Sequence, residues 1–320
     1  MRAVVTGGAG FVGSRVCEAL VDSGAEVVCL DNLLTGSLGN VAGLRGHPAF
    51  RFEHCDVAEG FTSRAVRAAL RPGVDLVLHL ASPASPVDYL EHPIETLDAG
   101  SRGTRAALEL ADEHGARLVL ASTSEVYGDP QVHPQTEAYW GNVSSVGPRS
   151  VYDESKRFGE ALAAGYRRAL GTDTGIVRIF NTYGPRMRAR DGRVVPTFVR
   201  QALAGEPLTI AGDGSQTRSL CYVEDLVAGL LAFAHSGHAG PMNLGNPHEL
   251  TVARIAEDVI RATGSASPVE HVERPLDDPG KRCPDITLAR TELGWEPQVA
   301  WLDGLARTVS WFRSRSQGAA

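Results

Sequence analysis

The sequence predicts an α/β protein in which a doubly wound parallel sheet is followed by a smaller, mixed α/β C-terminal lobe. Three observations lead to this prediction. The chain has 320 residues, more than one ordinary domain needs. Short runs rich in Val and Leu alternate with helical patterns through the first half, which is typical of βαβ units. Beyond about residue 180, Gly, Pro and Arg gather in loop-like stretches between shorter helices.

The expected elements follow in chain order. Unbroken apolar strands indicate a sheet covered on both faces, and we expect them at 2–6, 26–30, 74–80, 117–121 and 175–180, with a weaker strand at 50–52. Helical patterns lie between and after them, at 10–22, 62–71, 90–114, 152–170, 194–204, 223–235, 251–263 and 302–315. We therefore expect a first domain over residues 1–180, to which 219–245 returns, and a second lobe over 181–320.

The charge of the chain excludes some classes of protein. The 31 basic and 38 acidic side chains give a net charge of -7, which argues against a nucleic-acid partner. Only two of the basic residues, Lys156 and Lys281, are lysines; codon bias explains the excess of arginine but not why these two persist.

The cysteines and the first residues of the chain indicate in which cell compartment the protein is expected. Five cysteines without CxxC spacing, and the absence of His-Glu-x-x-His, predict neither disulfides nor a metal site. The first apolar run is too short for a signal peptide or a membrane span. We expect a cytoplasmic protein that is not attached to a membrane.

The first strand runs into a glycine motif. Gly7, Gly10 and Gly13 lie between a strand and a helix, where they allow a tight turn, backbone approach to a pyrophosphate and close helix packing. Asp31 ends the second strand, where a carboxylate accepts hydrogen bonds from a ribose 2′-hydroxyl and repels a 2′-phosphate. The pattern predicts a Rossmann-like domain that binds NAD rather than NADP. Asp56, after the third strand, either contacts the adenine or caps the next helix.

A second motif pairs a tyrosine with one of the two lysines. Tyr152 and Lys156 are four residues apart, so they share one face of a helix. An ammonium beside a phenol favours the phenolate, and so does the positive ring of a nicotinamide; with both, we expect the pKa of Tyr152 to fall toward the working pH. Such a tyrosine can take the proton of a sugar hydroxyl. A surface i,i+4 pair is the alternative.

A third motif follows the fifth strand. Thr123, Ser124 and Glu125 fall at the carboxyl end of that strand, where substrates of doubly wound sheets bind. We expect a third catalytic group among them. Turn capping is the alternative for the hydroxyl groups, and solvent exposure is the alternative for Glu125.

Together these motifs resemble the extended short-chain dehydrogenase/reductase family, the NAD-dependent epimerases and dehydratases of nucleotide sugars, and among them the UDP-glucuronate decarboxylases. The resemblance spans nearly the whole chain. It is carried by the stretches 79–86, 121–130, 178–187, 191–195, 214–218 and 282–286. Similar 4,6-dehydratases have an Asp-Glu pair where this chain has Ser124-Glu125, so the acid for a departing 6-hydroxyl is missing.

The resemblance implies an activity: NAD-dependent decarboxylation of UDP-glucuronate to UDP-xylose through a 4-keto intermediate. It assigns catalysis to Tyr152, Lys156, Thr123, Ser124, Glu125 and Arg282. It assigns cofactor binding to Gly7, Gly10, Phe11, Val12, Gly13, Asp31, Asn32, Thr35, Gly36, Asp56, Val57, Leu80 and Ser82, together with Tyr152 and Lys156. It assigns the nucleotide sugar to Pro83, Tyr89, Asn181, Arg193, Arg218 and Arg282; a solvated surface is the alternative for the arginines.

Two departures from the family pattern leave other outcomes open. Asp98 stands where the family usually has a lysine near the sugar, and Ala211 stands where an aromatic residue usually covers the base. A 4-epimerase, a decarboxylase for another base or sugar, or a non-catalytic NAD-binding protein are the alternatives.

The resemblance also implies a homodimer. Its interface would be formed by helices near 90–112 and 152–170, and the second of these has a small-residue face that includes Gly159, Ala163 and Ala164.

Overall fold

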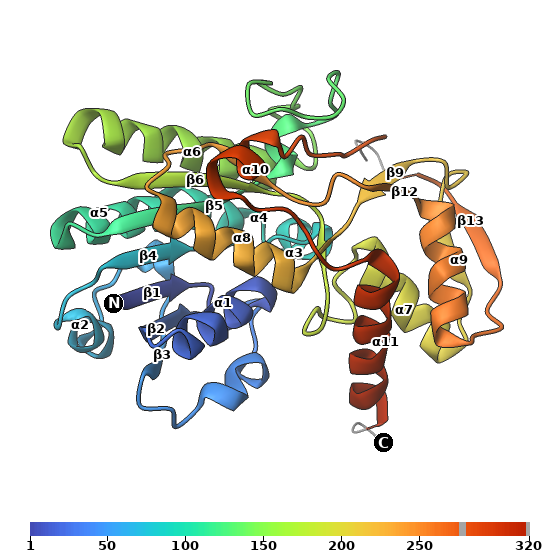
Figure 1. Ribbon diagram of the computed structural model, residues 1–320, viewed down its shortest axis with the longest axis horizontal. Coiled ribbons are helices and arrows are strands. Elements are labelled where there is room, and N and C mark those ends of the chain that lie inside the picture. Colours follow the sequence, from blue (N-terminus) through green and yellow to red (C-terminus); the bar gives the residue numbers. More distant parts are fainter. Residues whose placement is uncertain (275–279, 318–320) are drawn as a thin grey trace.

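The computed structural model describes residues 1–274 and 280–317 of the chain, with the side chains of 316 and 317 left out. Its centre is a seven-stranded sheet in the order β11-β6-β5-β4-β1-β2-β3, and every neighbouring pair is parallel (Figure 1). The strands are β1 (Arg2–Thr6), β2 (Glu26–Asp31), β3 (Phe50–His54), β4 (Leu76–His79), β5 (Arg117–Thr123), β6 (Thr174–Ile179) and β11 (Met242–Leu244). The predicted α/β class with a parallel sheet is confirmed.

Helices cover both faces of this sheet. One face packs against α1 (Phe11–Asp22) and α8 (Val223–Ser236), and the other against α2 (Arg64–Leu70), α5 (Thr104–His114) and α6 (Ser150–Leu170). Successive strand residues serve opposite layers: in β1, Val5 packs with the first group and Val4 with the second, and both are fully buried. This two-sided burial explains why the strands are apolar without a break.

The helix expected over 90–114 is interrupted, which corrects the prediction. The segment forms α3 (Pro86–Glu91), α4 (Pro93–Asp98), a π-helical stretch η3 (Ala99–Gly103) and then α5. Proline at the first position starts both short helices. Within the π stretch, a Cβ on Gly100 would lie 2.5 Å from that of Ser155, and one on Gly103 would lie 2.6 Å from Val57 Cγ2. The glycines bring this segment close to α6 and to the loop after β3.

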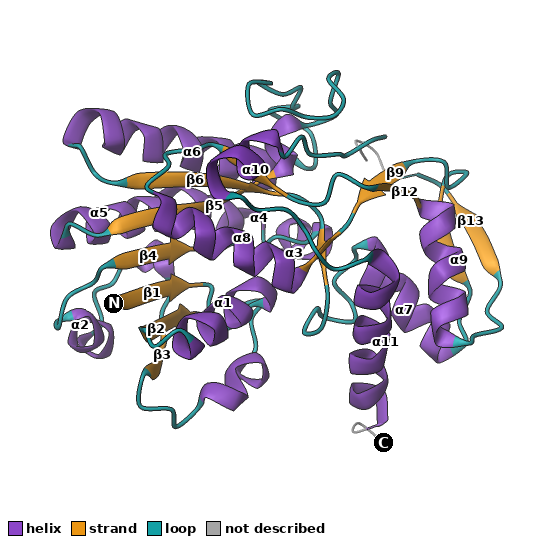
Figure 2. Cartoon of the chain, viewed as in Figure 1, coloured by secondary structure: helices purple, strands orange, loops and turns teal. Residues whose placement is uncertain are grey.

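A second group of elements lies beyond the carboxyl ends of the strands, at the right of Figure 2. Its core joins α7 (Val194–Ala204), α9 (Val252–Thr263) and α11 (Trp301–Gln317). Short strand pairs complete it: β7 (Thr182–Tyr183) with β10 (Cys221–Tyr222), β8 (Leu208–Ala211) with β13 (Val269–Val272), and β9 (Thr217–Ser219) with β12 (Glu249–Thr251). The remaining elements are α10 (Thr287–Leu293) and the 3-10 turns η1 (Leu38–Leu44), η2 (Val57–Glu59) and η4 (Ser124–Tyr127).

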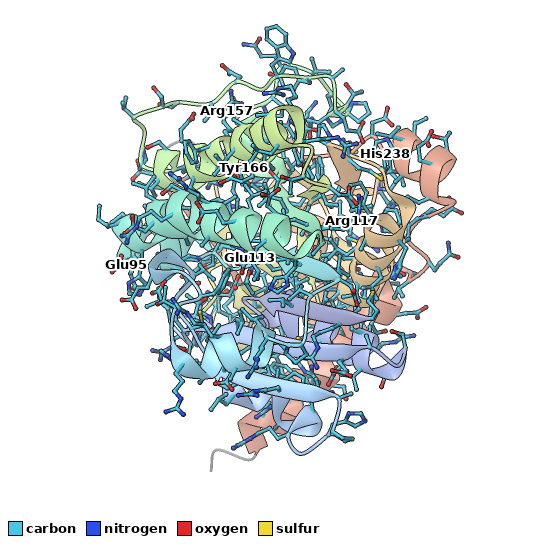
Figure 3. The ribbon with its side chains drawn as sticks, turned by 90° about the vertical axis from the view of Figure 1, so that its left-hand side faces the viewer. Glu95, Glu113, Arg117, Arg157, Tyr166 and His238 are labelled. Carbon is cyan, nitrogen blue, oxygen red and sulfur yellow. The ribbon has the colours of Figure 1, made fainter. Side chains whose placement is uncertain are left out.

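The small residues of α6 do not form a free face. Ala163 is fully buried within the chain's own core, and a Cβ on Gly159 would lie 3.4 Å from Leu120 Cδ2. The reasoning that offered Gly159 and Ala163 as a dimer surface is therefore wrong. They let α6 approach its own sheet, while the half-buried Arg157 and Tyr166 of the same helix are labelled in Figure 3.

Candidate active site

A cavity of about 680 Å³ opens along the carboxyl ends of the parallel strands and reaches into the second group of elements. Its size is in the range of small-molecule sites. It is lined by all but one of the predicted site residues: Gly7, Gly10, Phe11, Val12, Gly13, Asp31, Asn32, Thr35, Asp56, Val57, Leu80, Ser82, Pro83, Tyr89, Thr123, Ser124, Glu125, Tyr152, Lys156, Asn181, Arg193, Arg218 and Arg282. The exception is Gly36, which lies against Asp31. A Cβ built on this glycine would be 2.8 Å from Oδ1 of the Asp31 carboxylate.

The glycine loop after β1 is packed too tightly for side chains. Gly7 has a φ of +69°, and a Cβ there would lie 2.8 Å from the backbone of Ala81. A Cβ on Gly13 would overlap the carbonyl oxygen of Gly7. The helix α1 begins just after Gly10, so its free N–H groups and positive dipole end face the cavity. This is a cradle for a pyrophosphate.

The acidic residues beyond β2 and β3 are tied to the backbone. Asp31 accepts hydrogen bonds from the N–H of Ala9 at 2.9 Å and of Leu33 at 2.7 Å. Burial raises the pKa of Asp31, although these two bonds lower it. Asp56 caps the turn η2 through the N–H of Ala58, as its alternative interpretation predicts, and also accepts from Asn32 at 2.9 Å while lining the cavity.

Tyr152 and Lys156 lie on the buried face of α6. The Lys156 ammonium donates to the carbonyl of Ala121 at 2.9 Å and lies 5.8 Å from the centre of the Tyr152 ring. Burial lowers the pKa of Lys156 to about 8. Burial also raises the pKa of Tyr152 to about 12, against a lowering contribution from its hydrogen bond with Thr123. Burial thus outweighs the hydrogen bond among the protein's own groups; the expected fall in the pKa of Tyr152, to which a nicotinamide charge contributes, stays a prediction.

Glu125 is the centre of a charged cluster. Its Oε2 accepts a hydrogen bond from Arg149 at 2.6 Å and another from Arg282 at 3.2 Å. Arg282 is 1% exposed and also donates to the carbonyl of Ser124. Burial would raise the pKa of Glu125, but Arg282 and Arg149 hold it below its ordinary value. The carboxylate is therefore charged, fixed in place and turned to the cavity, not exposed to solvent.

Two members of this cluster were missed from the sequence. Arg149 lines the cavity and lies 5.9 Å from the centre of the Tyr89 ring, which itself stacks on Tyr152 at 5.2 Å. Asp153 is 6% exposed, and burial and the charge of Glu125 raise its pKa to about 7. Arg149 is three residues before Tyr152, and this spacing puts the two residues on one face of a helix. It is the sequence signal that could have identified Arg149.

The far end of the cavity is formed by polar residues of the second lobe. Arg193 is held by Asp191, whose carboxylate accepts from its guanidinium at 2.7 Å. Asn181 and Arg218 line the same cavity. The two residues that depart from the family pattern, Asp98 and Ala211, also line it.

Comparison with known proteins gives this arrangement a family. A model of the NAD dependent epimerase/dehydratase family matches residues 3–245. UDP-glucuronic acid decarboxylase 1 of Arabidopsis thaliana is 48% identical over 98% of this chain and 70% of its own length. UDP-glucuronic acid decarboxylase 6 of the same plant is 48% identical over 98% of this chain and 90% of its own.

Solved structures agree with the sequence relatives. UDP-glucuronic acid 4-epimerase from Bacillus cereus, in complex with UDP-glucuronic acid and NAD, superposes with a TM-score of 0.88 at 27% identity, covering 98% of this chain and 100% of that one. The family match covers more than half of the chain, and its relatives are matched over nearly all of it. The chain therefore belongs to the NAD dependent epimerase/dehydratase family.

Proposed function

We propose that this protein decarboxylates UDP-glucuronate to UDP-xylose with NAD as its cofactor. The relatives that match it over nearly the full chain at 46–48% identity are UDP-glucuronic acid decarboxylases. The feature that carries the proposal is one cavity joining the glycine loop, Tyr152 and the cluster of Glu125, Arg149 and Arg282.

The residues at the first end of the cavity fit NAD. The glycine loop packs so closely at Gly7 and Gly13 that neither position can hold a Cβ, and the start of α1 beside it offers free N–H groups that suit a pyrophosphate. Asp31 keeps a carboxylate at the end of β2, and that group suits a ribose hydroxyl better than a 2′-phosphate. When bound there, NAD supplies the acceptor for a hydride from C4 of the sugar.

We propose that Tyr152 and Lys156 handle the proton at C4. Tyr152 takes the proton of the C4 hydroxyl, with Thr123 in hydrogen-bond contact with its phenol. Lys156, held by the carbonyl of Ala121, keeps a positive charge beside the ring that favours the phenolate. The product of this step is a C4 ketone.

A C4 ketone is β to the C6 carboxylate, so the carbon–carbon bond between C5 and C6 can break. Carbon dioxide leaves, and the electron pair of that bond forms an enolate whose oxygen is stabilised by hydrogen bonds from Tyr152 and Thr123. A proton then returns to C5, and the C4 ketone takes back the hydride together with the proton of Tyr152, which restores the C4 hydroxyl and gives UDP-xylose. Glu125 and Arg282 are our candidates for this end of the sugar, because their charges face the cavity and fix each other.

The proposal is tested with purified protein, UDP-glucuronate and NAD. We expect carbon dioxide and a UDP-pentose whose sugar is identified as xylose by NMR. Recovery of only UDP-glucuronate would contradict the proposal. Recovery of a UDP-hexuronate with unchanged mass and an inverted C4 would replace it with the epimerase.

The 4-epimerase remains a second candidate because of two residues. Asp98 lines the cavity, and a carboxylate near the sugar, where the family pattern has a lysine, would repel a carboxylate substrate. Ala211 lines it where the family usually covers the base, and its carbonyl accepts from Gln216 at 2.6 Å. A panel of nucleotide sugars that differ in base and in C6 oxidation distinguishes these outcomes.

We also propose a homodimer formed by the α3–α4 segment and α6. Its support is apolar surface: Leu90, Ile94 and Phe158 are 55%, 64% and 50% exposed. Light scattering coupled to size-exclusion chromatography should give twice the chain mass, and Phe158→Glu should shift it toward the monomer. A monomer in the wild type would contradict the proposal.

Two broader assignments are also proposals. We propose that residues 1–180 with 219–245 hold the cofactor while 181–320 hold the nucleotide sugar, and limited proteolysis with and without each ligand tests this division.

We propose the cytoplasm as location, in keeping with five free, buried cysteines; cell fractionation tests it. Among the described residues, no helix has the length and apolar character to cross a membrane.

A further inference from the structure

Three side chains with metal-binding atoms meet outside the cavity. His133 lies in the loop after η4, Glu249 begins β12, and Cys283 lies in the segment before α10. One ligand atom from each lies within 4.8 Å of the other two. His133 Nε2 is 2.8 Å from Glu249 Oε2. None of the three lines the candidate active site.

The backbone around these side chains is fixed before any ligand arrives. Gln135 and Pro284 form a parallel bridge, in which the N–H of Gln135 donates to the carbonyl of Cys283 at 2.8 Å. The Gln135 side chain accepts from the N–H of Cys283 at 2.9 Å. The loop that carries His133 and the segment that carries Cys283 are thus held side by side.

The carboxylate is also oriented. Oε1 of Glu249 accepts a hydrogen bond from Thr217 at 2.6 Å, which leaves Oε2 directed at His133. Such a partner on the outer oxygen is what a metal-binding carboxylate ordinarily has. The histidine is the accessible member, with a side chain 35% exposed, so an ion can enter from solvent.

The cysteine supplies a soft, protected donor. Cys283 is 6% exposed, and its thiol donates to the carbonyl of Pro247 at 3.3 Å. Beside it lies the fully buried Ser219, whose hydroxyl interacts with the Cys283 sulfur. The sulfur is therefore held in place within 4.8 Å of the ligand atoms of His133 and Glu249.

We propose that His133, Glu249 and Cys283 bind one Zn²⁺ ion, with water as the fourth ligand. Imidazole, carboxylate and thiolate are the donors that zinc accepts, and three protein ligands with one open position are a common zinc arrangement. Tetrahedral bonds of about 2.0–2.3 Å place ligand atoms about 3.3–3.8 Å apart. The present separations, 2.8 Å for the closest pair and at most 4.8 Å for the others, reach this range with shifts of about 1 Å.

Sequence patterns could not show this site, because its ligands come from segments far apart in the chain. Metal sites that a sequence reveals have their ligands at short spacing, and the expectation of no metal rests on the absence of such spacing. His133 and Glu249 are 116 residues apart. Binding would release the thiol proton and would link the three segments, so it should also raise the unfolding temperature.

The test is titration of the metal-stripped protein with Co²⁺, which gives a thiolate-to-metal absorption band and tetrahedral visible bands. We expect saturation at one equivalent, displacement by Zn²⁺, and a rise in unfolding temperature with each metal. Cys283→Ser should remove the thiolate band. His133→Gln, at an accessible position, should weaken binding at least tenfold without affecting the fold.

Two control variants make the result specific. His235→Gln changes an exposed histidine of α8 outside the cluster, and Cys221→Ser changes another buried free cysteine. Both should bind Co²⁺ like the wild type. A thiolate band that survives Cys283→Ser, an affinity unchanged in His133→Gln, or an absence of saturable binding would each overturn the proposal.

Discussion

Glu125→Gln tests the charged cluster most directly. Oε2 of Glu125 accepts hydrogen bonds from both Arg149 and Arg282, at 2.6 and 3.2 Å. The change removes the negative charge while Arg282 stays 1% exposed. Breaking a buried ion pair by removing one partner costs about 3–5 kcal/mol. Because glutamine still offers a carbonyl oxygen, we expect the lower end, about 3 kcal/mol.

This loss translates into a temperature shift with a defined pH dependence. Unfolding entropy of about 2.1 cal/mol/K per residue gives roughly 0.7 kcal/mol/K for the chain, so Tm should fall by about 4 °C. The folded-state pKa of Glu125 lies below its ordinary value. Its stabilisation is therefore complete at neutral pH and is lost as the pH falls through that lowered pKa. Calorimetry at pH 7 and in acid should show the gap between variant and wild type closing in acid.

Activity separates the role of Glu125 from simple stability. If this carboxylate acts on the sugar, kcat should fall by about a hundredfold or more in Glu125→Gln. The matched control is Glu160→Gln, which breaks a similar part-buried ion pair. In that pair Glu160 Oε2 lies 2.7 Å from the Arg178 guanidinium, and neither residue lines the cavity. The control should lose comparable stability and keep its kcat. Equal activity in the two variants, or an unchanged Tm in Glu125→Gln, would refute the reasoning.

Three further changes test other parts of the site. Tyr152→Phe should lower turnover by about a hundredfold or more while NAD binding, measured by calorimetry, stays close to wild type. Gly13→Ala should weaken NAD binding by about 10- to 100-fold in the same assay, because overpacking costs about 1–3 kcal/mol. Asp153→Asn should gain stability over wild type from pH 5 to pH 8, by about 4 kcal/mol at most, because the raised pKa of Asp153 makes its ionisation costly. Thermal unfolding across that range measures it.

The sheet was readable from the sequence because burial on both faces leaves a plain signal. The runs at 2–6, 117–121 and 175–180 all became strands within a few residues of the expected bounds. The interrupted helix before α5 was not readable. Its π-helical turn exists because Gly100 and Gly103 must approach Ser155 and Val57, contacts that depend on the tertiary packing.

The same division holds for the site. Residues in motifs at strand ends, such as Gly7 and Glu125, could be placed because topology brings strand ends together. Helical spacing could have drawn attention to Arg149, but the sequence could not give the roles of Arg149 and Asp153, which depend on the nearness of Glu125 in the fold. Asp56 shows the limit within a motif: the sequence left capping and ligand contact open, and its side chain caps η2 while also lining the cavity.

Lys156 explains why one lysine persists in a chain whose other basic residues are almost all arginine. It is 7% exposed, its ammonium is bonded to Ala121, and burial lowers its pKa to about 8. A guanidinium there would bring five donors to the place where the lysine donates to the Ala121 carbonyl, and it would stay charged at every working pH. Burial acts on the neighbour too, raising the pKa of Tyr152 to about 12. A pKa of about 8 still leaves the Lys156 ammonium largely charged at neutral pH, 5.8 Å from the ring. A positive charge that enters the cavity would add to that of Lys156 in lowering the pKa of Tyr152.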